Sequence, residues 1–116
     1  MNLRPQIHNY VLLKQNTALI FYIRNKHKDF FKVEEGKEVT DVSSLGNVHT
    51  LDLSGIWGIT DVSSLGNAHT LNLFNCQGIT DVSSLGNVHT LNLSNCHQIT
   101  DVSSLGNVHT LIMIND

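Results

Sequence analysis

The octapeptide TDVSSLGN occurs at four places in this chain, and its copies follow one another at intervals of 20 residues. The copies begin at Thr40, Thr60, Thr80 and Thr100. A fixed period in this range is the signature of repeat architectures, in which each copy forms one unit that stacks on the next. The repeat therefore constrains the fold before any secondary structure is assigned.

Each copy contains a short segment with the two-residue alternation of a half-buried strand. In residues 90–93, Leu91 and Leu93 fall on one face, whereas Thr90 and Asn92 fall on the other. Since successive side chains of a strand point to opposite sides, we expect the leucines to lie inward. The copies then supply parallel strands about 4.8 Å apart, with the polar side chains lining the concave side.

The segment after each strand predicts a tight return. Asp101 precedes Val102, two serines and Leu105, and Gly106 follows. This order is typical of an N-cap, one turn of 3₁₀ or α helix, and a glycine exit. We expect these returns on the convex side.

Aligned on one register, a copy reads Val88-x-x-Leu91-x-Leu93-x-x-Cys96. This resembles the leucine-rich-repeat pattern L-x-x-L-x-L-x-x-N/C. The Cys-x-x-Ile-Thr-Asp part is similar to the cysteine-containing class of these repeats, and Asp-Val-Ser-Ser-Leu is similar to the shorter bacterial-internalin style. The resemblance implies an α/β fold, namely a short leucine-rich-repeat solenoid with a parallel sheet on its concave side.

The register extends back beyond the first octapeptide. The segment from Phe31 to Val33 falls 20 residues before the one from Leu51 to Leu53, which predicts a degenerate first strand. We therefore assign residues 31–116 to the solenoid and residues 1–30 to an N-terminal cap. Because Pro5 is followed by apolar residues without strand alternation, two or three short helices are expected there.

A second resemblance concerns this N-terminal segment. Pro5-x-Ile7, Tyr10–Leu13, Asn16–Leu19 and Asn25–Phe31 resemble an F-box, although Arg4 stands where that family has Leu before Pro. F-box/leucine-rich-repeat proteins are substrate receptors of ubiquitin ligases, and similar pairings occur in large DNA viruses of amoebae. The resemblance implies contact with the ligase's linker protein through Pro5, Ile7, Val11 and Leu12. The alternative, that the helices only cap the solenoid, stays open.

The charges are divided between the two segments. All seven Lys and Arg lie in residues 1–38, whereas residues 39–116 contain six Asp and no Lys or Arg. A surface without fixed positive charge cannot release phosphate counterions, which excludes nucleic acid as the ligand of the repeats. The chain has neither a long enough apolar run for a membrane span nor an export signal. We therefore expect an intracellular protein, in the host cytoplasm if it is viral, with its cysteines as thiols.

The repeated polar residues favour structural roles. The column of His49, His69, His89 and His109 does not converge as the ligands of a zinc site do, and one Asp per turn fits capping better than calcium binding. Cys76 and Cys96 occupy a slot that satisfies backbone groups. A Ser-His-Asp triad needs one converging set, whereas here every copy has the same residues. We expect no metal, no cofactor and no enzymatic activity.

The copies differ along the outward side of the strand and in the loop after it, where Trp57 and Phe74 stand out as candidate anchors. The positions predicted to contact a partner are Thr50, Asp52, Ser54, Trp57, Thr70, Asn72, Phe74, Thr90, Asn92 and Ser94. The predicted function is a non-catalytic protein–protein interaction module. The alternative is a structural or self-associating repeat without a dedicated ligand.

The last copy predicts self-association. Ile112 and Ile114 stand where the earlier copies have Asn or Asp and Ser or Phe. An apolar edge strand invites pairing with another chain, so we expect a twofold homodimer through this strand. A truncated chain that has lost its natural cap is the other interpretation, and it predicts aggregation of no fixed size.

Overall fold

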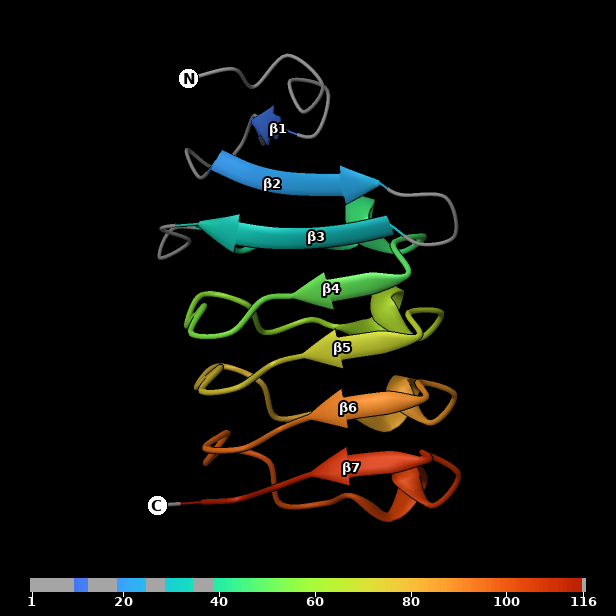
Figure 1. Cartoon of the computed structure of the whole chain (residues 1–116). Coiled ribbons are helices and arrows are strands. Elements are labelled where there is room, and N and C mark those ends of the chain that lie inside the picture. Colours follow the sequence, from blue (N-terminus) through green and yellow to red (C-terminus); the bar gives the residue numbers. More distant parts are fainter. Residues whose placement is uncertain (1–9, 13–18, 25–28, 35–38, 116) are drawn as a thin grey trace.

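The computed structural model describes residues 10–12, 19–24, 29–34 and 39–115. Within them the chain forms a single seven-stranded sheet whose spatial order follows the sequence (Figure 1). The strands are β1 (Tyr10–Leu12), β2 (Leu19–Arg24), β3 (Asp29–Glu34), β4 (Thr50–Asp52), β5 (Thr70–Asn72), β6 (Thr90–Asn92) and β7 (Thr110–Ile112).

The register of the sheet reproduces the 20-residue period. Strands β3 to β7 pair in parallel, and Leu51 lies beside Leu71, which lies beside Leu91 in the next pairing. Phe31 pairs with Leu51, so the predicted degenerate first strand is confirmed. Strands β1, β2 and β3 pair with one another antiparallel.

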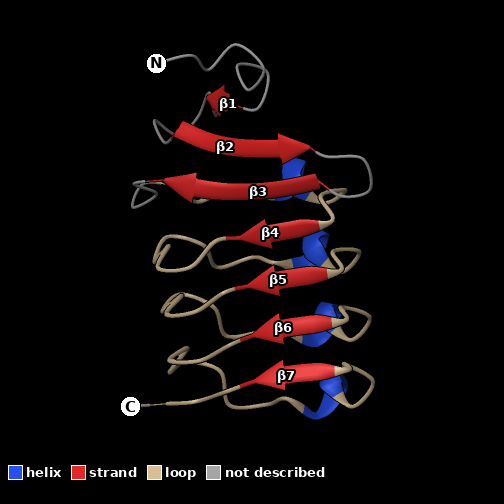
Figure 2. Ribbon diagram, viewed as in Figure 1, coloured by secondary structure: helices blue, strands red, loops and turns tan. Residues whose placement is uncertain are grey.

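Each parallel strand from β4 onward is preceded by one 3₁₀ turn, which lies behind the sheet (Figure 2). The turns are η3 (Ser43–Leu45), η4 (Ser63–Leu65), η5 (Ser83–Leu85) and η6 (Ser103–Leu105). We call a strand together with the return that precedes it a rung. Repeated strand and 3₁₀ units in a parallel sheet are compatible with a repeat solenoid. Among the described residues there is no α-helix, and none of the helical segments is long and apolar enough to cross a membrane.

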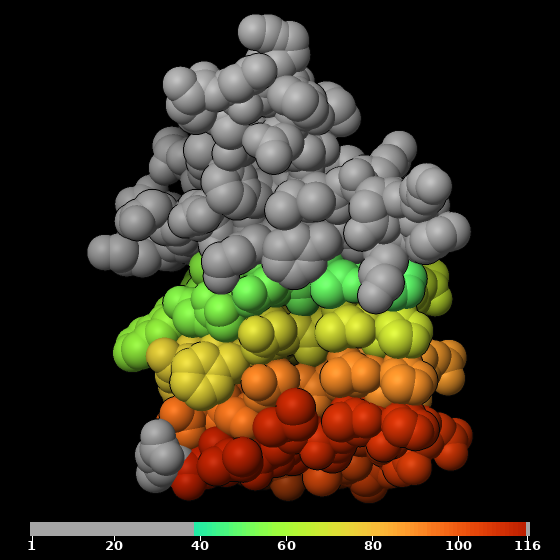
Figure 3. Space-filling view, viewed as in Figure 1, coloured from blue at the N-terminus to red at the C-terminus, as the bar shows by residue number. Residues whose placement is uncertain are grey.

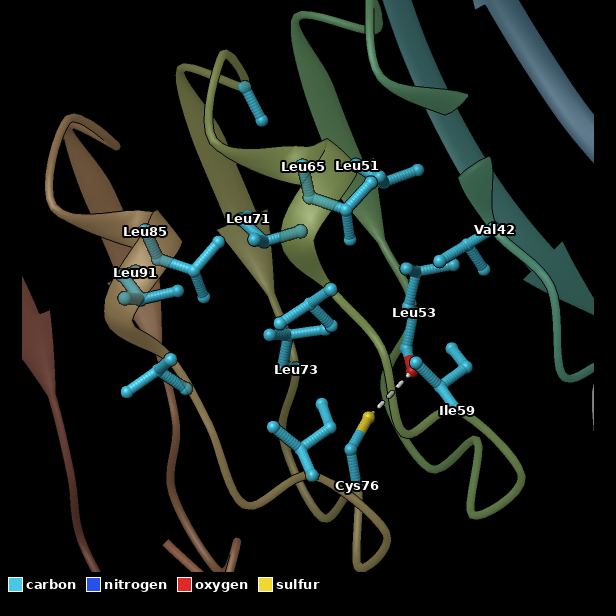
Figure 4. Packing of buried hydrophobic residues seen from close by; sticks show 14 of the residues in the cluster. Val42, Leu51, Leu53, Ile59, Leu65, Leu71, Leu73, Cys76, Leu85 and Leu91 are labelled. Atoms are coloured by element: carbon cyan, nitrogen blue, oxygen red, sulfur yellow. Dashed lines mark hydrogen bonds between the residues drawn. The ribbon is translucent and has the colours of Figure 1, made fainter. Parts of the chain in front are cut away.

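The core lies between the sheet and the turns, and each rung adds the same set of apolar side chains to it (Figure 4). Leu71 and Leu73 are almost completely buried, as the alternation predicted. Leu65 reaches the same core from the turn side. Because each layer covers the next, burial comes from stacking and not from any single rung.

The glycine that follows each turn is required by the approach of the next rung. Gly66 has φ −66°, a right-handed conformation that any residue adopts, so the expected glycine exit is not a left-handed cap. A Cβ at Gly66 would lie 2.5 Å from the Ser84 carbonyl oxygen, and one at Gly86 would lie 2.8 Å from that of Ser104. Gly106 has no atom within 4 Å of the corresponding position.

The expected N-terminal helical cap is wrong wherever the structure describes this segment. Residues 10–12, 19–24 and 29–34 are strands. Ile20, Phe21, Tyr22 and Ile23 are β-branched or aromatic residues, which favour strands, and a short apolar run does not distinguish helix from strand by its period. Val11 and Leu12 therefore lie in β1 and not in a helix. Pro5 and Ile7 lie outside the described residues.

Candidate functional site

The outward face of the parallel strands carries columns of equivalent side chains, one per rung. The first column is formed by Thr50, Thr70, Thr90 and Thr110, all half-buried. Each threonine Oγ1 is hydrogen-bonded to Nδ1 of the preceding histidine, at 2.9 to 3.0 Å. Thr50, Thr70 and Thr90, which were predicted to contact a partner, thus lie on this face, and each also makes a structural hydrogen bond with the preceding histidine.

The next column consists of Asp52, Asn72 and Asn92, which are also half-buried. In each of them Oδ1 accepts a hydrogen bond from the backbone N–H two residues later, at 2.9 to 3.0 Å. This is the Asx turn that short polar side chains favour, and it ends the strand. These predicted contact residues therefore have a local structural role.

The column that follows contains Ser54, Phe74, Ser94 and Ile114, and it is uneven. Phe74 is 40% exposed and Ile114 is 69% exposed, whereas Ser94 between them is only 4% exposed. Ser94 Oγ accepts a hydrogen bond from the Ile114 N–H at 2.9 Å. The structure contradicts the prediction that Ser94 contacts a partner, because Ser94 is buried and its hydroxyl binds the backbone just after the last strand.

Trp57 is the most exposed aromatic side chain among the residues whose side chains are described, at 62%. It lies in the turn after β4, in the slot that Gln77 and His97 occupy in later rungs. Gln77 is held by hydrogen bonds from Nε2 to the Asn75 side chain and the Asn95 carbonyl. Together with Phe74, Trp57 supplies the large apolar groups that the sequence predicted at this edge.

Two residues before each of these positions, in the loop where the copies differ, the backbone restricts the residue type. Gly55, Asn75 and Asn95 have φ values of 79°, 61° and 60°, in the left-handed region. Glycine and asparagine adopt this conformation most readily. The signal was present in the sequence, because the slot contains only these two residue types.

The histidine column forms as predicted. The rings of His49, His69, His89 and His109 stack with centroid distances of 4.5 to 4.7 Å and interplanar angles of 10 to 12°. Parallel rings present their nitrogens side by side instead of toward one point. Within the described part of the chain, no group of three or more His, Cys, Asp or Glu is arranged to hold a metal ion.

Stacking changes the titration of His89. Loss of hydration, followed by the charges that His109 and His69 would carry, lowers the pKa of His89 below its ordinary value of 6.5. The unfolded chain then takes up this proton first, so the stability that neutral His89 contributes above pH 6.5 is lost as the pH falls through that value. His89 therefore couples the stability of the fold to mild acidity.

We expect the melting temperature to be lower at pH 5.5 than at pH 7.5, as measured by circular dichroism. The lowered pKa values of Asp61, Asp81 and Asp101 act only below their ordinary value of 3.8 and do not affect this range. A His89→Asn variant should show a smaller difference between the two curves, whereas His97→Asn, outside the column, should keep it. Superimposed wild-type curves would contradict the prediction.

The cysteine and aspartate side chains are hydrogen-bonded to backbone groups of the repeat. The Cys76 thiol donates a hydrogen bond to the Leu53 carbonyl at 3.1 Å (Figure 4), and burial raises the pKa of Cys76 to about 12. Cys96 repeats this contact with Leu73 at 2.9 Å. Asp61 lies one residue before Val62, which is the N-cap of the turn, and Oδ1 of Asp61 accepts a hydrogen bond from the Ser63 N–H at 2.9 Å, as its equivalents do in the other rungs. The proposed structural roles of the thiols are confirmed. The prediction that the aspartates are the N-cap residues is wrong, because valine is at the N-cap of each turn and no side chain makes a capping hydrogen bond there.

The outer side of the last rung is more exposed than the sequence indicated. Besides Ile114, Val102 and Leu111 are both 37% exposed, although both belong to the inward set of the repeat. Ile112 is half-buried. The apolar edge therefore includes, besides the predicted Ile112 and Ile114, two residues whose equivalents in the earlier rungs are buried.

Comparison of the chain with protein-family models, with curated proteins and with solved structures finds no match. The resemblances to leucine-rich repeats and to the F-box thus depend on the residues quoted above.

Proposed function

We propose that the described residues of segment 31–116 form a short leucine-rich-repeat solenoid whose outward sheet face binds another protein without catalysing a reaction. The observation that carries this proposal is the exposure of Trp57 and Phe74, at 62% and 40%, beside a face whose polar groups are held in local hydrogen bonds. Large aromatic side chains in such positions are typical anchors of protein interfaces.

The solenoid is supported by the agreement between sequence period and register. Each strand pairs with the strand 20 residues later at equivalent positions, and each turn contacts the next turn. The inward leucines and the cysteine slot have the burial that the leucine-rich-repeat pattern implies. A stack of this kind offers an extended face for binding, as repeat proteins do generally.

The shape of the surface favours binding over catalysis. On the face seen in Figure 3, the rungs form successive layers, and the coloured surface shows no deep hollow that would enclose a small substrate. The repeated Asp and the His of the column each recur once per rung, and the hydrogen bonds described above hold their side chains. A reaction needs one converging set of such groups, whereas an interface needs only a rigid surface with a few anchors.

Recruitment to a ubiquitin ligase is a separate prediction, and it depends on the F-box resemblance alone. Of the four residues implied in that contact, two lie in β1 and two lie outside the described residues. The proposal for the sheet face does not require it.

The experiment is affinity capture from the cells that produce the protein, with wild type compared to a Trp57→Ala, Phe74→Ala double variant. We expect at least one captured protein to be lost from the double variant, and its Kd to rise more than about five-fold, the equivalent of ~1 kcal/mol. Fluorescence of Trp57, the single tryptophan, should shift when this partner is added to the wild type.

His97→Ala is the matched control, because His97 is exposed and occupies the same slot as Trp57 two rungs later. This variant should retain the partner. Equal binding by wild type and double variant would show that the aromatic pair is not the anchor. A melting temperature of the double variant far below that of the wild type would invalidate the comparison, so it is measured first.

A further inference from the structure

Trp57 and Phe74 lie in two loops that are next to each other on one side of the stack (Figure 1). The first loop, residues 54–58, comes after β4, and the second loop, residues 74–78, comes after β5. At the start of the second loop, the Phe74 carbonyl accepts a hydrogen bond from the Gly55 N–H at 2.7 Å. The backbone of Phe74 is therefore bound directly to the loop that contains Trp57.

The end of the second loop also contacts the first loop. A Cβ at Gly78 would lie 2.6 Å from the Trp57 carbonyl oxygen and 2.8 Å from that of Ile59, so the two backbones approach as closely as only a glycine permits. Gly55 alone among the described glycines has a positive φ, so the conformation of Gly78 is open to any residue. Glycine is required at this position by the contact with the first loop.

The repeat by itself does not require glycine in this slot, because the next rung has Gln98 there. The rung that precedes Gln98 has Gln77 in the slot of Trp57, and the Gln77 side chain is held by two hydrogen bonds from its Nε2. No hydrogen bond holds the Trp57 side chain within the described part of the chain. The placement of Trp57 therefore depends on how its backbone is packed.

We propose that the two loops form one pre-formed binding surface, in which Gly78 is the positioning residue that fixes Trp57 relative to Phe74. This inference rests on the proposed function, since it concerns how the same two anchors are presented to a protein partner. Binding through an ordered side chain loses less conformational entropy than binding through a mobile one, so a fixed Trp57 strengthens binding. Gly78 acts through Trp57 and not through a contact of its own with the partner.

Amide relaxation of the full chain, measured by NMR, tests the ordering of Trp57 without a partner. We expect the Trp57 amide of the wild type to have an order parameter of about 0.85, the value of a rigid backbone. In Gly78→Ala the added Cβ displaces the Trp57 carbonyl, so the order parameter of this amide should fall and its chemical shift should change. A wild-type order parameter below about 0.6, the flexible range, would overturn the proposal even if the variant did not fold. A Trp57 amide that is unchanged in Gly78→Ala would overturn it as well.

Gly86→Ala is the matched control for this variant. A Cβ at Gly86 would lie 2.8 Å from the Ser104 carbonyl oxygen, so the variant makes a similarly close contact between rungs, but after a 3₁₀ turn and outside both loops. It should lose stability through overpacking, whereas its Trp57 amide should keep the wild-type order parameter. Equal changes at Trp57 in the two variants would indicate a general loosening of the stack and contradict the specific role of Gly78.

The Kd for the protein captured by the wild type tests the consequence for binding. It should rise roughly two- to ten-fold in Gly78→Ala, the effect of ordering one more large side chain on binding, and stay unchanged in Gly86→Ala. In a Trp57→Ala background, Gly78→Ala should have no further effect, because the side chain through which it acts is gone. Additive losses, or a wild-type Kd in Gly78→Ala, would overturn the positioning role. Capture of the same proteins by wild type and by the double variant lacking both aromatic side chains would instead refute the proposed function, and the relaxation measurement would still decide whether Gly78 orders Trp57.

Discussion

Replacing Leu73 with Ala should lower the free energy of unfolding by about 2 to 5 kcal/mol, the range for large-to-small changes in a packed core. Leu73 is completely buried, and its layer packs against the layers on both sides (Figure 4). Its carbonyl accepts the hydrogen bond from the Cys96 thiol, so a shift of the backbone into the cavity would also disturb the next rung. Urea unfolding followed by circular dichroism measures the change.

Phe74→Ala is the control for this variant, since the two residues are adjacent but lie on opposite faces of the strand. Phe74 is 40% exposed, so its truncation should cost less than about 1 kcal/mol, in the range of ordinary surface changes. A Phe74 variant that is as unstable as the Leu73 variant would show that the strand faces are assigned wrongly. Together the pair tests which face is the core and which is the proposed binding surface.

Replacing Gly66 with Ala should lower the free energy of unfolding by about 1 to 3 kcal/mol, as overpacking of a rigid interior does. The added Cβ would meet the Ser84 carbonyl oxygen at 2.5 Å, and a backbone atom cannot move aside without separating two rungs. Thermal unfolding of the variant should remain a single transition at a lower temperature. An unchanged melting temperature would mean that the rungs are farther apart than the structure has them.

Gly106→Ala isolates the cause, because Gly106 has the same place in the repeat and φ −61°. No atom lies within 4 Å of its Cβ position, so the variant should be neutral or gain about 0.4 to 1 kcal/mol from the smaller entropy of its unfolded chain. If both glycine variants lost stability equally, the local conformation and not the stacking contact would be responsible. The difference between them is a direct measure of rung-to-rung contact.

The repeat region was predictable to the level of single side chains. A period of 20 residues, combined with alternation within each copy, determines which leucines are inward and which strands pair. The histidine stack and the thiols bonded to backbone carbonyls were predicted for the same reason. In a stacked repeat, the neighbours of a residue belong to its own copy or to the similar copies beside it. The sequence of one copy therefore shows which residue types meet in each contact between layers.

The tertiary structure determined the features that lie outside the 20-residue repeat or that differ between its copies. Residues 10–12 and 19–24 have no internal copy to fix their register, and apolar runs of this length suit helix or strand equally; they are strands because they pair with each other and with β3. Ser94 is buried and hydrogen-bonded to the Ile114 N–H, whereas Leu111 is 37% exposed although its equivalents in the earlier strands are buried. Identical copies thus specify which side chains are buried inside the stack. A side chain is buried only when the neighbouring layer covers it, so the exposure of an individual residue depends on the residues beside it.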